Sequence, residues 1–430
     1  MKLSDRYSPE SLAKSSLPDK TGRLFMNHHA MMDLSNVEVV GASVDTVRQL
    51  YFGIPKPYLI ESFQQEIEQK EQFFHLAMPN ENDRSHTEPF HLAKMGKVAR
   101  YRYKLQNNEL GVVILFGSYY NLIENEGQHL KIELSPKFIS CRTAKSIQDY
   151  MDTLASRLLM KYEAKGCSVH LACDYQNFTL PRNFLDHLST YSRTIKAYDG
   201  VSQIDLSDIS EAVTTYGSPK QERNYLIGKP DCVQMAIYDK SYEIVKSDKV
   251  DYFHNEWGTY SLGVYDPEKV VRRIEARIHH KVIREIGQGM GVQLESFEHV
   301  SEYLTNIWRY ALKINRFNLI QGKDMLHPFW QLLMEDVHFY VPAQNFEVSR
   351  KKKQSVDPVA KNITSLVGNF ISLCVRQGYD HDDVMIFLKA MPVWGRIRQY
   401  YKERGLNETD IRENIKKSML MRRLLSRQAA

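Results

Sequence analysis

The chain has 430 residues, of which 43% are hydrophobic and 25% are charged, and its formal net charge is +5. This length predicts two or three domains, and the composition is that of a globular protein, which excludes a disordered tail. The longest apolar runs, such as the one from Leu110 to Phe116, suit a buried strand and are too short to cross a bilayer. The N-terminal residues include no apolar stretch typical of a secretory signal.

The cysteines indicate a reducing compartment. The chain has five, an odd number, and no two of them form a Cys-x-x-Cys pair. This usage argues against a disulfide framework and against a zinc knuckle. We therefore expect a soluble, intracellular protein that needs no membrane partner.

The net charge conceals an uneven distribution. From Arg350 to Ala430 there are 17 Lys or Arg residues against 8 Asp or Glu residues, a balance of +9, so the other 349 residues sum to −4. A basic terminal region on a nearly neutral body favours a polyanionic partner, because each phosphate that is neutralised releases counterions. A solubilising helical face explains the charge alone equally well.

The first half of the chain mixes strand and helix patterns. Residues 1–25 read as a flexible arm. Alternating or apolar runs predict strands over 99–105, 110–120 and 130–136, the first two separated by a polar break typical of a hairpin. Apolar residues at helical spacing predict a helix over 143–166, with Gly166 as its C-cap.

The pattern continues in the same style to residue 296. It predicts a strand over 168–178, a helix over 180–198, a loop and hairpin region over 214–228, and a strand over 233–244 that carries Tyr238 and Lys240. Residues 270–287 begin as a strand and end as a helix. We therefore expect an α+β domain over 26–296, with a largely antiparallel central sheet and flanking helices.

Helical patterns dominate the remainder. Residues 297–349 predict a helical extension, and 350–430 a basic helical C-terminal region that begins with a linker-like stretch. Capped amphipathic helices are expected over 357–378, 380–391 and 407–428, the last with Asn407 or Thr409 as its N-cap.

Four predicted strands carry polar residues that share a face. Residues two or four apart on a strand project to the same side of a sheet. These residues are Glu133; His170 and Asp174; Tyr238 and Lys240; and Arg273, Glu275 and Arg277. Each alone is also typical of a solvated surface, but together they predict one polar cleft.

Such a set suits metal-assisted phosphoryl transfer. Carboxylate oxygens are ligands for Mg²⁺ or Mn²⁺, which would polarise a scissile phosphate. A tyrosine hydroxyl can attack the phosphate and retain the strand end covalently. Lys240 or the two arginines would balance the charge of the transition state.

The motifs resemble, in their order, those of the rolling-circle replication initiators of filamentous bacteriophages, the gene II protein class. The resemblance rests on "KIELSP", "HLACDYQ", "IYDKSYE" and "RRIEARIHHKVIREIG", between about Leu130 and Gly287. Some of these motifs are also similar in arrangement to those of the trans-acting initiators of small Gram-positive plasmids. The resemblance implies a nickase and ligase that acts on single-stranded DNA at a replication origin in the bacterial host cytoplasm, with a host helicase or polymerase as a further partner.

The resemblance also implies residue roles. Tyr238 would be the nucleophile and Lys240 its companion. Asp174 and Glu275 would be metal ligands, with Glu133 as a further candidate.

Several assignments stay open. Tyr242 lies on the face of Tyr238 if the strand continues, and is then a rival or second nucleophile. Many rolling-circle enzymes bind their metal through a His-hydrophobe-His strand, and this sequence has no such triplet. The metal would then rest on carboxylates and on His170. Arg273 and Arg277 would contact phosphate or else hold Glu275 in place.

Three other classes of protein compete with the nickase. A non-catalytic DNA-binding regulator or origin-binding protein would bind the origin without Tyr238 and without metal. A metal-dependent nuclease would cut DNA and leave no covalent adduct. A tyrosine recombinase requires His-x-x-Arg ahead of a tyrosine near the C-terminus, and the sequence after Arg350 has no such triad. The oligomeric state, the origin sequence and the choice of metal stay open.

Overall fold

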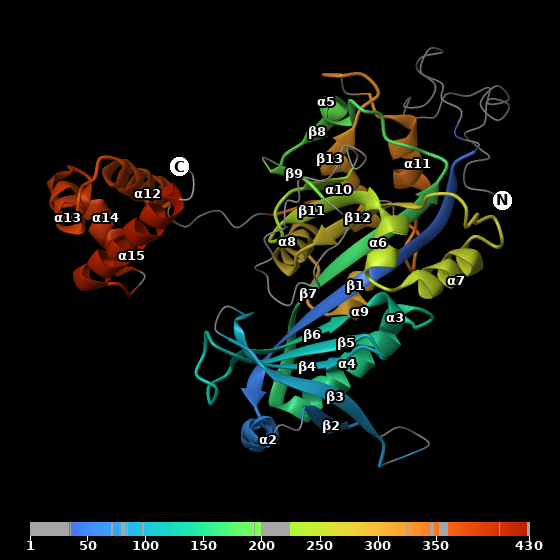
Figure 1. Cartoon of the computed structure of the whole chain (residues 1–430), viewed down its shortest axis with the longest axis horizontal. Coiled ribbons are helices and arrows are strands. Elements are labelled where there is room, and N and C mark those ends of the chain that lie inside the picture. The colour runs from blue at the N-terminus through green and yellow to red at the C-terminus, as the bar shows by residue number, and fades with distance from the viewer. Residues whose placement is uncertain are drawn as a thin grey trace. The chain divides into compact units, whose positions relative to one another are not determined.

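The computed structural model divides the chain into two compact units, Met1–Lys351 and Lys352–Ala430 (Figure 1). It describes residues 34, 36–69, 72–78, 83, 85–96, 99–192, 194–198, 224–323, 325–344, 348–351, 360–403 and 405–427. The division falls within the basic stretch at which the helical C-terminal region was expected to begin. The arm expected over 1–25 lies outside the described residues.

A large antiparallel sheet forms the centre of the first unit, which confirms the α+β class (Figure 1). Over the described residues it contains 11 strands. In spatial order they are β2 (Phe73–Ala77), β3 (Thr87–Lys94), β4 (Tyr101–Asn107), β5 (Val112–Ser118), β6 (Gly127–Leu134), β1 (Glu38–Pro55), β7 (Leu159–Gln176), β12 (Arg272–Ile278), β11 (Val233–Asp239), β10 (Tyr225–Ile227) and β9 (Ile195–Ala197). A separate pair joins β8 (Leu188–Thr190) to β13 (Asn315–Phe317).

Helices flank this sheet, and most of them share its hydrophobic core. They are α2 (Pro57–Glu68), α3 (Pro136–Ile139), α4 (Ala144–Leu158), α5 (Phe184–His187), α6 (Lys240–Lys246), α7 (Val250–Tyr260), α8 (His280–Met290), α9 (Phe297–Ser301), α10 (Leu304–Ile314) and α11 (Pro328–Asp336). Helices α9 to α11 come from the segment expected as a helical extension. Because Trp308 and Trp330 are fully buried in the same cluster as the strand residues, this segment belongs to the core of the first unit.

Strands β1 and β7 connect the two halves of the sheet. Each is 18 residues long, and they pair from Glu38 with Gln176 to Pro55 with Leu159. On its other edge β1 pairs with β6 only between Val47 and Gly53. The part of β1 before Val47 therefore has no second strand beside it among the described residues.

The helix expected over 143–166 is shorter than the prediction. Helix α4 ends at Leu158, and β7 begins at Leu159. The intervening residues have helical spacing, but the backbone of β1 pairs with them and extends the strand. Gly166 is therefore not a C-cap; it lies at a bulge of β7 with φ of +135°, a conformation that glycine adopts easily.

Two further element predictions are wrong. Among the described residues of 180–198 only α5 is helical, because the residues after it pair as β8 with β13 and as β9 with β10. The strand from Val233 ends at Asp239, where its side chain accepts a hydrogen bond of 2.9 Å from the backbone N–H of Tyr242. This N-cap starts helix α6 at Lys240.

The second unit contains the three expected helices, which are α12 (Ala360–Arg376), α13 (His381–Ala390) and α15 (Glu408–Arg427). It also contains α14 (Trp394–Lys402), which was not expected, and the four enclose a core of their own. Asp380 forms a capping box with Asp383 at the start of α13, and Asn407 exchanges hydrogen bonds with Asp410 at the start of α15. Asn407 is thus the N-cap. Within the described parts of the chain, every helix is too short or too polar to span a membrane.

Candidate active site

Strands β7, β12 and β11 gather polar residues on the face of the sheet opposite the main core. On the core face, Val169, Leu171 and Cys173 of β7 pack with the matching apolar residues of β12 and β11. On the other face, Arg273 pairs with Asp174 on one side and with Tyr238 on the other, and Arg277 pairs with His170. His170 with Asp174, and Arg273 with Glu275 and Arg277, share a face of their strands as expected.

Glu275 lies at the centre of this polar face. Its cross-strand neighbours are Ala172 of β7 and Ala236 of β11, whose small side chains leave room for longer ones to reach it. The residue as a whole is 2% exposed. Its Oε1 lies 3.0 Å from Nδ1 of His170 and accepts a 2.8 Å hydrogen bond from Nε of Arg277.

Tyr238 bonds to the other oxygen of the same carboxylate. Its hydroxyl donates a hydrogen bond of 3.1 Å to Oε2 of Glu275. The ring packs edge-on against Tyr198, with 5.3 Å between centroids, and the residue is only 4% exposed. The tyrosine selected from the sequence is therefore joined directly to the selected glutamate.

Asp45 completes the cluster, and the sequence did not reveal it. It lies on β1 at a bulge between Val44 and Thr46, where the strand has one extra residue relative to β7. Three possible ligand atoms lie within 4.8 Å of one another: a carboxylate oxygen of Asp45, a ring nitrogen of His170 and a carboxylate oxygen of Glu275. The local pattern did not single out Asp45, because β1 contains other polar residues such as Ser43 and Thr46. A period-2 pattern also does not show where a bulge turns a side chain.

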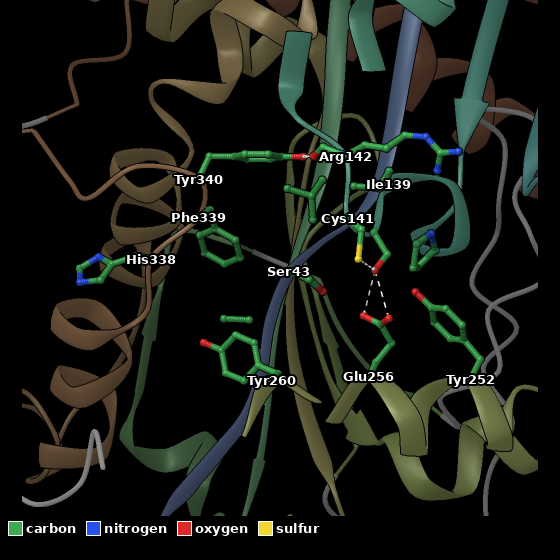
Figure 2. Close-up of a pocket in the computed structure, with 14 residues that line it drawn as sticks. Ser43, Ile139, Cys141, Arg142, Tyr252, Glu256, Tyr260, His338, Phe339 and Tyr340 are labelled. Atoms are coloured by element: carbon green, nitrogen blue, oxygen red, sulfur yellow. Dashed lines mark hydrogen bonds between the residues drawn. The ribbon is translucent and has the colours of Figure 1, made fainter. Parts of the chain in front are cut away.

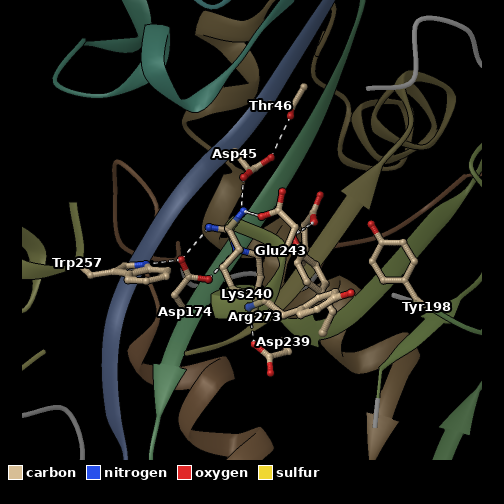
Figure 3. Close-up of polar contacts among 12 residues, drawn as sticks. Asp45, Thr46, Asp174, Tyr198, Asp239, Lys240, Glu243, Trp257 and Arg273 are labelled. Atoms are coloured by element: carbon tan, nitrogen blue, oxygen red, sulfur yellow. Dashed lines mark hydrogen bonds and ion pairs between the residues drawn. The ribbon is translucent and has the colours of Figure 1, made fainter. Parts of the chain in front are cut away.

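Arg273 connects Asp45 to Asp174 (Figure 3). Its side chain is 1% exposed, and its Nε and Nη2 donate to the two oxygens of Asp174 at 2.6 and 2.7 Å, while Nη1 pairs with Asp45. Trp257 also donates to Asp174, at 2.8 Å. Asp174 therefore orients Arg273, and it is not among the residues whose ligand atoms lie within reach of one another, which are Asp45, His170 and Glu275.

Lys240 and Tyr242 do not share the strand face that was expected for them, because the strand ends at Asp239. Lys240 is nevertheless buried beside the cluster. It pairs with Glu243 and its Nζ lies 4.1 Å from the ring centroid of Phe253. Tyr242 is 39% exposed on α6, with Lys246 over its ring.

Glu133 lies apart from these residues. It is on β6 and pairs with Arg48 of β1, whose Nε donates to it at 2.9 Å. Three strand spacings, about 14 Å, separate β6 from β12. Glu133 is thus on the polar face but outside the metal-binding distance of Glu275.

The electrostatics favour the metal-binding forms of the three grouped residues. Burial opposes ionisation of Asp45 and Glu275, yet Arg273 and Arg277 respectively hold the pKa of each carboxyl below its usual value. Burial lowers the pKa of His170, which keeps its imidazole neutral. Burial and then the charge of Glu275 raise the pKa of Tyr238 well above its usual value, so its hydroxyl keeps its proton.

The grouped residues fit a divalent cation. They offer two carboxylate oxygens and one imidazole nitrogen, a set that suits Mn²⁺ or Mg²⁺ and leaves other positions for water or phosphate. Among the described residues, a second group of this kind comprises Asp380, His381 and Asp382. It is exposed, and Asp380 already serves there as a helix N-cap.

No family model matches the chain. The chain is similar to a protein of Pseudomonas phage Pf1 described as "Uncharacterized protein ORF430". The two are 26% identical over 422 residues, which cover 94% of this chain and 93% of the phage protein.

Proposed function

We propose that this protein is a metal-dependent nickase and strand transferase for single-stranded DNA that initiates rolling-circle replication. One observation carries the proposal. A single buried carboxylate, that of Glu275, accepts a hydrogen bond from the Tyr238 hydroxyl on one oxygen. The same carboxylate belongs, with Asp45 and His170, to the group that fits a metal. A nucleophile, a proton acceptor and a metal site thus meet within one cluster.

The residues suit the following reaction. The Tyr238 oxygen forms a bond to the phosphorus as its proton passes to Glu275, and the bond from phosphorus to the 3′ oxygen breaks. The 3′ oxygen leaves and takes up a proton, and the 5′ end stays on the protein as a phosphotyrosine. A bound Mg²⁺ or Mn²⁺ would supply charge stabilisation at the phosphate. Because the phosphotyrosine conserves the phosphodiester energy, a free 3′ hydroxyl can reverse the step and rejoin the strand.

The charges of the cluster agree with this chemistry. Its acids are Asp45, Asp174, Glu243 and Glu275, and its cations are Lys240, Arg273 and Arg277. With a neutral His170, four carboxylates against three cations leave one net negative charge. A divalent cation would reverse this sign, which favours both an incoming phosphodiester and the phenolate of Tyr238.

Two features outside the cluster support a DNA substrate and a phage context. The region from Arg350 to Ala430 has a formal net charge of +9, which suits contact with phosphates. The similarity to a protein of a Pseudomonas phage supports a bacteriophage context. We propose the bacterial host cytoplasm as the place of action, with a host helicase or polymerase as a partner.

A second candidate function is a non-catalytic origin-binding regulator. The burial of Tyr238 favours it, because a tyrosine that is 4% exposed and bonded to a carboxylate also serves as a purely structural contact. Such a protein would bind origin DNA equally well without Tyr238 and without metal.

The deciding experiment is a search for a covalent adduct. The full chain is incubated with Mn²⁺ or Mg²⁺ and with labelled single strands tiled from the replicon that encodes it, and a denaturant-stable protein–DNA band is sought. We expect the band for wild type and for Tyr242→Phe, and its loss in Tyr238→Phe. Tyr242 is a matched control, since it lies four residues away but on the exposed side of α6.

Each other outcome has one meaning. If the band disappears only in Tyr242→Phe, the reaction stands and the nucleophile is wrong. If wild type forms no band on any strand yet binds one duplex site tightly, the regulator replaces the nickase. Strand cleavage without a band would identify a metal-dependent nuclease.

A further inference from the structure

A cavity of about 280 Å³ lies beside the part of β1 that precedes Val47 (Figure 2). Ser43 lines it from the strand, and Ser140 and Cys141 line it from the segment after α3. Its volume is near the lower end of the range for ligand sites, about 300–1,000 Å³. The space therefore suits one flat base.

Aromatic side chains from two segments surround this cavity. Tyr252 and Tyr260 come from α7, and Phe339 and Tyr340 come from the chain after α11. Tyr260 is 46% exposed and Tyr340 is 45% exposed, so both offer ring surface. Rings of this kind stack on unpaired bases of any sequence.

One carboxylate adds selectivity to the aromatic lining. Glu256 of α7 points toward Ser140, whose hydroxyl lies 3.1 and 3.2 Å from its two oxygens (Figure 2). Both oxygens accept hydrogen bonds and donate none, so the group favours a ligand with adjacent N–H donors. It disfavours bare phosphate, which carries the same sign of charge.

The cavity adjoins the candidate active site. Ser43 pairs with Ala172 of β7, and Ala172 pairs with Glu275 of β12. Two strand spacings, about 10 Å, therefore separate Ser43 from Glu275. Tyr252 is also within electrostatic reach of Asp45: its pKa is raised first by burial, then by Glu256, and further by Asp45.

We propose that this cavity binds one unpaired guanine of the single strand, a few nucleotides from the phosphate that Tyr238 attacks. The proposal rests on the nicking function above. Guanine presents two neighbouring donors, N1–H and the N2 amino group, to the two oxygens of Glu256, while the Ser140 hydroxyl can turn to donate to O6. Thymine offers a single N–H, so it is the weakest ligand. The cavity thereby sets the sequence at which the strand is cut.

Cys141 provides a test that needs no catalysis. It lines the cavity and is exposed, whereas Cys167, Cys173 and Cys374 are buried. The full chain in a metal-free buffer is alkylated in the presence of the trinucleotides dTdGdT, dTdAdT, dTdCdT or dTdTdT, and Cys141 modification is followed by peptide mass spectrometry. We expect dTdGdT to protect at the lowest concentration, roughly 5- to 150-fold below dTdTdT.

Variants identify the group responsible. Glu256→Gln should abolish the preference for dTdGdT, while Glu268→Gln, which removes the same charge from an exposed position outside the cavity, should retain it. Tyr260→Ala should weaken protection by all four trinucleotides about equally, because it removes stacking and leaves the hydrogen bonds. The wild-type ranking needs no substitution, so the test survives a variant that folds poorly.

The outcomes separate this inference from the proposed function. Equal protection by all four trinucleotides, or none at concentrations that saturate binding of a longer strand, would overturn the guanine site even if the adduct forms. A guanine preference that depends on Glu256, found in a protein that forms no adduct, would support the cavity and refute the nickase. Protection by dTdGdT that persists in Glu256→Gln would refute the role of that carboxylate and with it the proposal.

Discussion

Replacing Glu275 with glutamine removes one buried negative charge at the centre of the polar face. The carboxylate contacts His170, Arg277 and Tyr238 at 2.8 to 3.1 Å, and its side chain is 3% exposed. In the variant, the Arg277 guanidinium loses the carboxylate that neutralises it. Glutamine keeps one acceptor oxygen, so one of these hydrogen bonds survives.

The size of the effect follows from burial. Breaking a buried ion pair by removing one partner costs about 3–5 kcal/mol, because the other charge stays uncompensated. The Arg277 side chain is 16% exposed and also donates to Tyr198 at 3.2 Å, so we expect the lower end, about 3 kcal/mol. Because the pKa of Glu275 is lowered in the folded protein, this stability is complete above its usual value near 4.5 and disappears as the pH falls through the folded value.

Glu133→Gln is the matched control. Glu133 pairs with Arg48 on the same face, with side chains 10% and 17% exposed, but it lies outside the metal-binding group. Urea denaturation followed by tryptophan fluorescence should give similar losses of stability at pH 7 for both variants. Titration with Mn²⁺, followed by its electron paramagnetic resonance signal, should show weaker binding only in Glu275→Gln. A loss below about 1 kcal/mol for Glu275→Gln, or equal weakening of Mn²⁺ binding in the control, would refute the reasoning.

Four further predictions concern pH dependence, packing, a helical glycine and helix capping. Burial lowers the pKa of His170 below 6.5, so as the pH falls the unfolded chain binds a proton on this imidazole before the folded protein does. The free energy of unfolding of wild type should therefore decrease below about pH 6.5. Urea denaturation at pH 7.5 and 5.5 should show a smaller decrease for His170→Gln. A Cβ added at Gly53 would lie 2.0 Å from the carbonyl oxygen of Lys161, so Gly53→Ala should lower the unfolding midpoint, at a cost of about 1–3 kcal/mol. Gly258→Ala, which meets open space in α7, should raise stability by about 0.5–1 kcal/mol in the same assay. Asp380→Ala removes a capping box and should cost about 0.5–2 kcal/mol, seen as earlier loss of helical circular dichroism on heating.

The strands that bury one face were readable from the sequence. Alternation located β4, β6 and β12 to within a few residues, because the direction of a side chain on a strand depends only on its position along that strand. A continuous apolar run located β5. Helix ends with local capping signals, such as Asp380 and Asn407, were equally accessible. These features are decided by neighbouring residues.

Segments whose state depends on distant partners were not readable. The residues after Leu158 have helical spacing, and pairing with β1, about a hundred positions earlier, makes them a strand. Within 180–198 the chain pairs with β13 and β10, both of them later in the sequence, which overrides its helical pattern. A weak local preference yields to a ladder of hydrogen bonds with another strand.

The candidate site divides along the same line. The sequence by itself determined that His170, Glu275 and Tyr238 project from one face of their strands, since that is a local property. Only the tertiary structure decided which of the polar residues meet, because contact depends on the register between strands. The tertiary structure places Glu133 outside the group and pairs Asp174 with Arg273. It adds Asp45, which lies at a bulge of β1 in the part that pairs with β7 and not with β6. Register and bulges are set by two strands together, and so no single segment of sequence specifies them.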